Sequence, residues 1–317
     1  AGYRTAWIGK WHLGETPREH GFETSLADST AGATPSYFAP YGIPSLPDGP
    51  PGEYLTDRLT DEAVRFLRAQ HEQPFLLVLS HYAPHLPLAA PAGLVAEFEQ
   101  HADPGAPQHN PVYAAMIARL DASVERIRAT LEELSLAEHT LLVFTSDNGG
   151  FESKRLVRKR KAGPGDTDES VAITSNLPLR AGKGRLYEGG LRVPLVAWGG
   201  PLVARGTSAV PVIGMDLLPT LLGLAGCAPL ATSDGLDLAP LLRGERGPAR
   251  EALYFHFPHQ SFQSALRAGD EKLVHGWREE RAELYDLATD PGEQHDLAAE
   301  RPARAAELEA FVDRIVP

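Results

Sequence analysis

The chain has 317 residues, 43% of them hydrophobic and 23% charged, a composition typical of a globular protein with room for about two domains. Its formal net charge of −12 argues against general nucleic-acid binding, which requires a basic face, but it leaves an anionic small substrate possible. No run approaches the about 20 apolar residues that span a bilayer. The single cysteine, Cys227, excludes an internal disulfide.

Hydrophobic patterning predicts alternating strands and helices up to about residue 150. The predicted elements are strands at residues 4–8, 74–80 and 141–144 and helices at 56–70 and 111–134. Residues 15–51 are rich in Pro, Gly, Ser and Thr and are predicted to form a long irregular excursion, as is the stretch before residue 111. The alternation favours an α/β fold with a mostly parallel sheet covered by helices on both faces.

The pattern changes after residue 250. Before that point we expect a polar insertion at 152–176, a strand at 191–198, a helix at 215–225 and a short closing segment at 235–242. The predicted elements that follow are short strands at 254–257, 263–266, 272–275 and 283–287 and a helix at 302–315. We therefore expect a main domain at 1–250 and a small C-terminal α+β subdomain, with an antiparallel sheet and a terminal helix, at 251–317.

The predicted strand at 141–144 leads into Asp147 and Asn148, followed by two glycines. Ligands bind at the carboxyl ends of strands in open α/β sheets, and carboxylate and amide oxygens suit a hard cation such as Ca²⁺. An Asx-type turn after a strand explains the same residues without a ligand.

Other charged side chains follow strand ends or glycines in the same way. These candidates are Lys10, His12, His85 and Lys183. Together with a metal pair they would make a pocket for a tetrahedral anion, because lysine is a point-charge donor suited to sulfate or phosphate. Singly, each is more simply explained as a solvated lysine or a turn-capping histidine. The basic run at 154–161 is typical of a solvated loop, although it could attract an anionic substrate.

Several motifs resemble those of the type I, formylglycine-dependent sulfatases, in the same order and along nearly the whole chain. They are GYRTAWIGKWHLG at 2–14, YLTD at 54–57, YAPHLP at 82–87, TSDNGG at 145–150, LRAGKG at 179–184, YEGGLRVP at 187–194, DLLPT at 216–220, ELYDL at 283–287 and DPGE at 290–293.

The resemblance implies an alkaline-phosphatase-like α/β fold and hydrolysis of a small-molecule or carbohydrate sulfate ester, in a periplasmic or extracellular setting. It implies that Asp147 and Asn148 hold Ca²⁺ and that Lys10 and Lys183 bind sulfate oxygens, with Lys10 also touching the nucleophile. His12 would contact the formylglycine hydrate and act as a base, and His85 would bind sulfate and protonate the departing alcohol.

The chain departs from the family pattern at the nucleophile, which lies in a C-x-P-S-R motif, and at a pair of N-terminal aspartates that also bind the metal. CAPLA at 227–231 has no arginine and lies late in the chain, and TPSY at 34–37 has no residue to oxidise. Both missing elements precede the first motif in the family, so we expect this chain to lack an upstream piece that contains them.

Three expectations follow for the 317-residue chain on its own: no activity, weak Ca²⁺ binding, and aggregation through an apolar sheet edge left without its neighbour. Two alternatives stay open for the whole protein. One is a phosphonate monoester or phosphodiester hydrolase on the same scaffold, and the other is a non-catalytic, sulfatase-like anion-binding protein.

Overall fold

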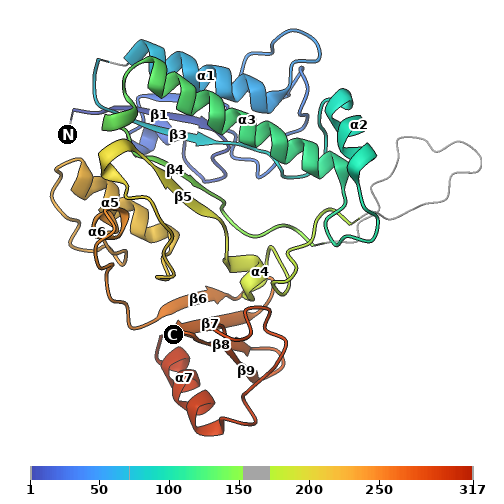
Figure 1. Cartoon of the computed structure of the whole chain (residues 1–317), viewed down its shortest axis with the longest axis vertical. Helices are drawn as coiled ribbons and strands as arrows, with labels where there is room; N and C mark the ends of the chain where they lie inside the picture. Colours follow the sequence, from blue (N-terminus) through green and yellow to red (C-terminus); the bar gives the residue numbers. More distant parts are fainter. Residues whose placement is uncertain (1, 71, 153–171, 316–317) are drawn as a thin grey trace, which may run out of the picture. The chain divides into compact units, whose positions relative to one another are not determined.

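The computed structural model describes residues 2–70, 72–152 and 172–315, so the basic run at 154–161 lies outside the described residues. It divides into two compact units, one up to Leu141 and one from Leu142 (Figure 1). The predicted fold class is confirmed, since a parallel sheet lies among helices and an antiparallel sheet follows near the C-terminus.

The first unit is built on a parallel sheet in the order β2-β1-β3. Its elements are β1 (Arg4–Gly9), the 3-10 helix η1 (Pro17–His20), β2 (Thr24–Leu26), α1 (Leu55–Gln70), β3 (Phe75–Ser80), α2 (Ala92–His101), α3 (Pro111–Glu133) and the 3-10 helix η2 (Ala137–His139). In register, Trp7 of β1 pairs with Ser25 of β2 and with Val78 of β3. The strands β1 and β3 therefore run side by side and end together at Gly9 and Ser80.

Helix α1 packs on β1 and β3 and lies beside α3 (Figure 1). Its residues Leu55, Leu59, Ala63 and Leu67 are buried, and their spacing of four places them on one face of the helix. Helix α3 begins at Asn110, whose side chain accepts hydrogen bonds from two backbone N–H groups of the first turn.

Four elements of the first unit were not predicted. Residues 15–51 include η1 and β2, the stretch before α3 includes α2, and η2 follows α3. Strand β2 has only three residues, too few to show an alternating pattern, and its pairing with β1 fixes it.

The second unit contains a two-stranded ribbon and a four-stranded sheet. Its elements are β4 (Leu142–Thr145), α4 (Glu188–Leu191), β5 (Leu195–Trp198), the 3-10 helices η3 (Gly200–Leu202) and η4 (Gly214–Asp216), α5 (Leu217–Leu224), α6 (Ala239–Leu242), β6 (Leu253–Phe257), β7 (Gln263–Ala268), β8 (Glu271–Gly276), β9 (Arg281–Asp286) and α7 (Pro302–Ile315).

Strand β4, predicted as part of a mostly parallel sheet, pairs antiparallel with β5, and Phe144, Leu195 and Val196 of this ribbon are exposed. The prediction of a buried parallel strand was wrong because a short apolar run indicates a strand but does not specify its partner or its direction. Exposed apolar side chains on neighbouring strands are the kind of surface that promotes association.

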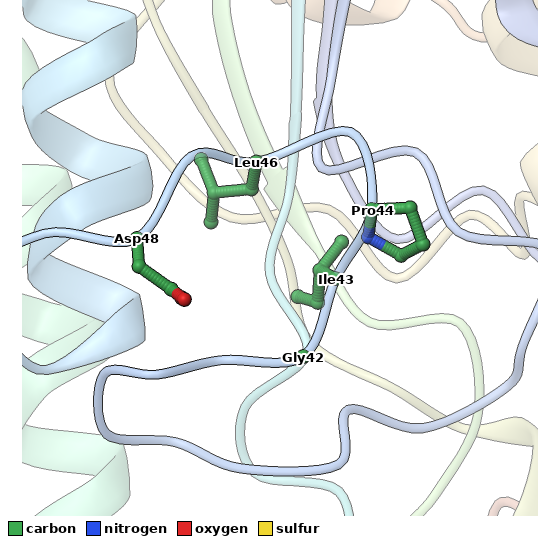
Figure 2. Close-up of a pocket in the computed structure, with 5 residues that line it drawn as sticks. All are labelled: Gly42, Ile43, Pro44, Leu46 and Asp48. Carbon is green, nitrogen blue, oxygen red and sulfur yellow. The ribbon is translucent and has the colours of Figure 1, made fainter.

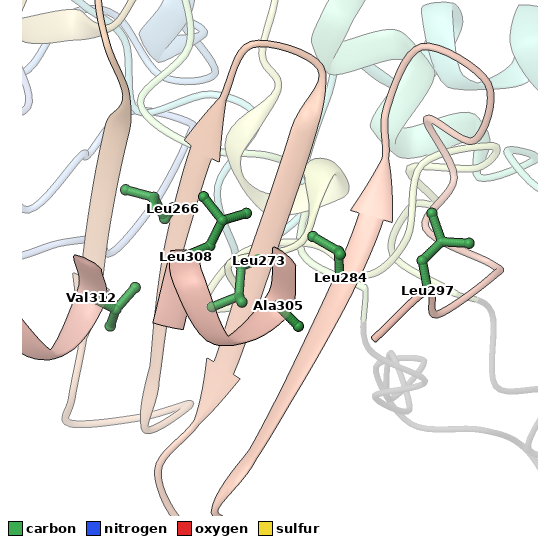
Figure 3. Close-up of a cluster of buried hydrophobic side chains, with 7 residues drawn as sticks. All are labelled: Leu266, Leu273, Leu284, Leu297, Ala305, Leu308 and Val312. Carbon is green, nitrogen blue, oxygen red and sulfur yellow. The ribbon is translucent and has the colours of Figure 1, made fainter. Parts of the chain in front are cut away.

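The four-stranded sheet is an antiparallel meander, β6-β7-β8-β9, with α7 packed against it. Figure 3 shows Ala305, Leu308 and Val312 of α7 facing the sheet. The strand residues Leu266, Leu273 and Leu284 complete this core, and each is at most 1% exposed. The predicted antiparallel sheet and terminal helix are confirmed, and Gly269, with φ 62°, lies in the turn between β7 and β8.

Among the described residues, no helix is both long enough and apolar enough to cross a membrane.

Candidate functional site

The six predicted site residues fall into two groups. Lys10, His12 and His85 belong to the first unit, and Asp147, Asn148 and Lys183 belong to the second, where Lys183 is joined to the segment after Asn148. We predicted that all six residues line one pocket. That pocket would include residues of both units, and it stays a prediction.

The loops that carry Lys10 and His85 leave neighbouring parallel strands. The Lys10 N–H donates to Ser80 O at 2.7 Å, directly beyond the last β1–β3 pair. A Cβ at Gly9 would lie 1.9 Å from the same oxygen, so only glycine allows this approach. The Trp7 indole donates to the carbonyls of Gly9 and Lys10, at 3.2 and 3.1 Å. The backbone of Lys10 is thus fixed on both sides, while its side chain is half-exposed.

His12 adopts a left-handed backbone conformation, with φ 56°. Its N–H donates to Ser29 O at 3.2 Å. Gly32 lies against the imidazole ring, because a Cβ there would be 2.6 Å from Cε1 and 2.7 Å from Nε2. The excursion after β1 therefore folds back onto His12, a contact that local sequence does not reveal.

His85 is held by backbone and tyrosine contacts. Its N–H donates to Tyr82 O at 2.9 Å, and the Tyr37 hydroxyl donates to His85 O at 2.9 Å. Burial raises the pKa of Tyr37, so this hydroxyl stays a donor. The His85 Nδ1 lies 2.9 Å from Leu86 O, which can only accept. Nδ1 is therefore protonated, and Nε2 is the atom that can exchange a proton with a ligand.

Asp147 and Asn148 follow β4 in a short turn. The Ser146 hydroxyl donates to Asn148 O at 2.9 Å, and the Asn148 amide nitrogen donates to Gly149 O at 2.9 Å. The amide oxygen of Asn148 is left as an acceptor, beside the exposed carboxylate of Asp147. Both oxygens are hard ligands, so these residues fit part of a Ca²⁺ site, which takes about six to eight oxygens. Within the described residues, no group of three or more His, Cys, Asp or Glu could hold a metal.

The Lys183 loop is joined directly to the segment after Asn148. The Lys183 N–H donates to Gly150 O at 3.0 Å. Asn176 bridges the same two segments: its side chain accepts from Gly150 N–H at 2.9 Å and donates to Gly150 O and Ala181 O at 2.9 and 3.0 Å. The role of Asn176 was not predicted, since it was assigned only as the last residue of the polar insertion at 152–176. Its position three residues before the motif LRAGKG is the one sequence feature that could have indicated a role near Lys183.

Gly149 is closely packed, and we expect Gly149→Ala to destabilise the protein. A Cβ there would lie 1.7 Å from Gly189 O, and the Gly149 N–H donates to Gly190 O at 3.0 Å. The expected loss in free energy of unfolding is about 1–3 kcal/mol, measured by urea unfolding. The control is Gly214→Ala, where a Cβ meets nothing within 4 Å. Equal unfolding midpoints for the two variants would contradict the packing described here.

His81, the residue directly after β3, is a structural residue. Its Nδ1 is buried and has no hydrogen-bond partner in the part of the chain that the structure describes. Its Nε2 lies 3.0 Å from Ser123 Oγ, which is 2.7 Å from Thr60 Oγ1. Burial lowers the pKa of His81 to about 4. The ring is therefore neutral near pH 7.

A pH dependence of stability follows from His81. Its folded pKa, about 4, is below the ordinary value of 6.5, so the unfolded chain binds the proton more tightly. Stability is expected to fall as pH drops from about 6.5 towards 4, by up to about 3 kcal/mol. In urea unfolding, His81→Gln should reduce this dependence of the free energy of unfolding on pH. The control His139→Gln, at an exposed position, should leave the dependence unchanged. An unchanged slope in His81→Gln would show that other groups cause the dependence.

A surface pocket of about 320 Å³ lies elsewhere in the first unit, lined by Gly42, Ile43, Pro44, Leu46 and Asp48 (Figure 2). Asp48 Oδ1 already accepts a hydrogen bond from Tyr41 N–H at 2.7 Å. None of the six predicted site residues lines this pocket, and it offers no second charged group to bind an ion.

Comparison with known proteins agrees with the fold and the motifs. Residues 1–227 match the family model for Sulfatase, and residues 182–312 match the model for N-sulphoglucosamine sulphohydrolase, C-terminal. The chain is 32% identical to the steryl-sulfatase of Mus musculus over 292 residues, which cover 82% of this chain and 43% of that protein. It is 29% identical to arylsulfatase A of Bos taurus, in a match that covers 93% of this chain and 64% of that protein.

The fold also matches the crystal structure of Ps i-CgsB in complex with k-i-k-neocarrahexaose. The TM-score is 0.80 at 26% identity, over 99% of this chain and 71% of that one. The protein therefore has an α/β structure with the sulfatase fold. By the family match over residues 1–227, the chain belongs to the sulfatase family. It spans less than two thirds of the length of the steryl-sulfatase and of arylsulfatase A.

Proposed function

We propose that the full-length protein containing this chain hydrolyses sulfate esters, and that this chain supplies its anion-binding and proton-transfer groups. The observation that carries the proposal is the Sulfatase match over residues 1–227, which includes all six candidate residues. It is supported by the joining of the Lys183 loop to the turn of Asp147 and Asn148.

In this proposal Lys10 and Lys183 bind sulfate oxygens and stabilise the charge on them. His12 contacts the nucleophile and acts as a base, and His85 protonates the departing alcohol from Nε2. The Nδ1–H of His85 faces Leu86 O, which leaves Nε2 as the nitrogen that transfers the proton. Ca²⁺ held in part by Asp147 and Asn148 would add positive charge beside the sulfate.

The nucleophile, a formylglycine in this family, would come from residues before the motif at 2–14, together with further metal ligands. It would supply the oxygen that attacks sulfur. The 317-residue chain alone is then inactive, because groups that act as a unit lose nearly all activity when one is removed.

We favour a saccharide sulfate as the substrate. Ps i-CgsB, which shares this fold at 26% identity, was crystallised with k-i-k-neocarrahexaose. We further propose that residues 1–250 form the catalytic domain and 251–317 a subsidiary one, supported by the separate core between α7 and the meander.

The test compares aryl sulfate hydrolysis by the 317-residue chain and by the full-length protein, with both shown to be folded. Activity only in the full-length protein is expected. Activity of the chain alone would overturn the assignment of the nucleophile. A full-length protein without activity, and without an oxidisable residue upstream, would instead be a non-catalytic anion-binding protein.

A further inference from the structure

Helix α4 forms the support on which the Lys183 loop rests. The Gly189 N–H donates to Arg180 O at 2.9 Å, and Gly190 O accepts from Gly149 N–H at 3.0 Å. A Cβ at Gly189 would lie 2.5 Å from Arg180 O, so the two backbones are in direct contact. A displacement of α4 would therefore displace the loop that carries Lys183.

A buried ion cluster fixes the first residue of α4. Lys272 Nζ of β8 lies 2.8 Å from Glu188 Oε1 and 2.8 Å from Glu293 Oε1, and Lys272 is 1% exposed. The Glu188 N–H donates to Glu293 Oε2 at 2.6 Å. Burial raises the pKa of Glu293, and Lys272 opposes this rise. The half-exposed Arg192 lies 3.7 Å from the other oxygen of Glu188. Lys272 is thus the one buried cation of this cluster among the described residues.

The segment of Glu293 also touches the Lys183 loop directly. The Arg180 guanidinium donates to Glu293 O at 3.2 Å and to the Tyr285 hydroxyl at 2.6 Å. A Cβ at Gly292 would lie 2.9 Å from Pro178 O. Gly189, next to Glu188, and the segment of Gly292 and Glu293 therefore both contact the residues just before 181–185.

We propose that Lys272 is a positioning residue for sulfate binding: by holding Glu188 and Glu293 together, it fixes α4 and the loop that presents Lys183 to the sulfate. A helix of four residues has too few internal hydrogen bonds to fix itself, so its anchor decides where the loop lies. A lone buried carboxylate is costly, so loss of Lys272 would drive Glu188 and Glu293 apart or into water. The inference rests on the proposed role of Lys183.

The test is a double-mutant cycle in the full-length protein, with inorganic sulfate as a competitive inhibitor of aryl sulfate hydrolysis. Lys272→Gln is expected to raise the inhibition constant of sulfate about tenfold, the effect of weakening one charged hydrogen bond. Lys272→Arg, which keeps the cation, should restore most of the affinity. In a Lys183→Ala background, Lys272→Gln should have little further effect, because it acts through Lys183.

The matched control is Arg250→Gln, which removes the guanidinium paired with the fully buried Asp216 in the same unit. It should lower the melting temperature as Lys272→Gln does, but leave the inhibition constant unchanged. If Lys272→Gln fails to fold, Glu293→Gln takes its place in the cycle. It keeps an acceptor for the Glu188 N–H and is expected to give a smaller rise in the inhibition constant, again absent in Lys183→Ala.

The outcomes separate the two proposals. If Lys183→Ala leaves the inhibition constant unchanged, Lys183 does not bind sulfate and the proposed function is wrong at this residue. If Lys183→Ala weakens inhibition but the cluster variant leaves the inhibition constant unchanged, only the positioning role is wrong. The same holds if the double variant raises the inhibition constant by the product of the two separate effects.

Discussion

His85→Ala in the full-length protein is expected to lower kcat/KM by about 10²- to 10⁴-fold for sulfate esters whose alcohol is a poor leaving group. Leu86 O accepts from Nδ1–H, so a proton that His85 gives to the alcohol would come from Nε2. A nitrophenolate needs little help from an acid. The loss should therefore be much smaller for 4-nitrophenyl sulfate than for a saccharide sulfate.

A suitable control for His85 is His101→Ala. The ring of His101 also lies within hydrogen-bonding distance of a backbone carbonyl, Glu97 O at 2.9 Å, but it sits in α2 and is exposed. Activity of this variant should equal that of the parent on both substrates. An equal loss on both esters in His85→Ala would contradict its role as the acid and leave it only a binding role.

Asp147→Ala is expected to weaken Ca²⁺ binding by the full-length protein, and its activity, by at least about a hundredfold. The carboxylate of Asp147 is the one formal charge that this turn offers a cation. The exposed Asp234→Ala, in the same unit, should change neither Ca²⁺ affinity nor activity.

The 317-residue chain should bind Ca²⁺ only weakly, because Asp147 and Asn148 give too few of the about six to eight oxygens that the ion takes. Calorimetry that showed tight binding to this chain, abolished by Asp147→Ala, would mean that the chain already holds a complete site.

Elements with strong local signals were predicted closely. Helix α7 spans the predicted residues 302–315, and α3 begins at the predicted residue 111, directly after the Asn110 cap. The spacing of apolar residues and the residues at helix ends are local features that can be read directly from consecutive sequence positions. Strand β2 and the antiparallel pairing of β4 were missed, because both depend on partners distant in the chain.

The site was predictable to the extent that its residues occur in motifs. The motifs indicated Lys183 and the pair Asp147 and Asn148, and the structure joins their segments through Gly150. They gave no reason to expect the Asn176 bridge or the Lys272 cluster. Each links positions far apart in sequence, and an asparagine or a lysine alone is most often solvated.

We propose that Lys10, Lys183, His12 and His85 belong to an enzyme that acts on sulfate esters. The most direct test is kcat/KM of the full-length protein on a sulfate ester and a phosphonate monoester with the same alcohol. We predict the larger value for the sulfate ester. A larger value for the phosphonate ester would contradict the account and assign the same groups to a phosphonate or phosphodiester hydrolase.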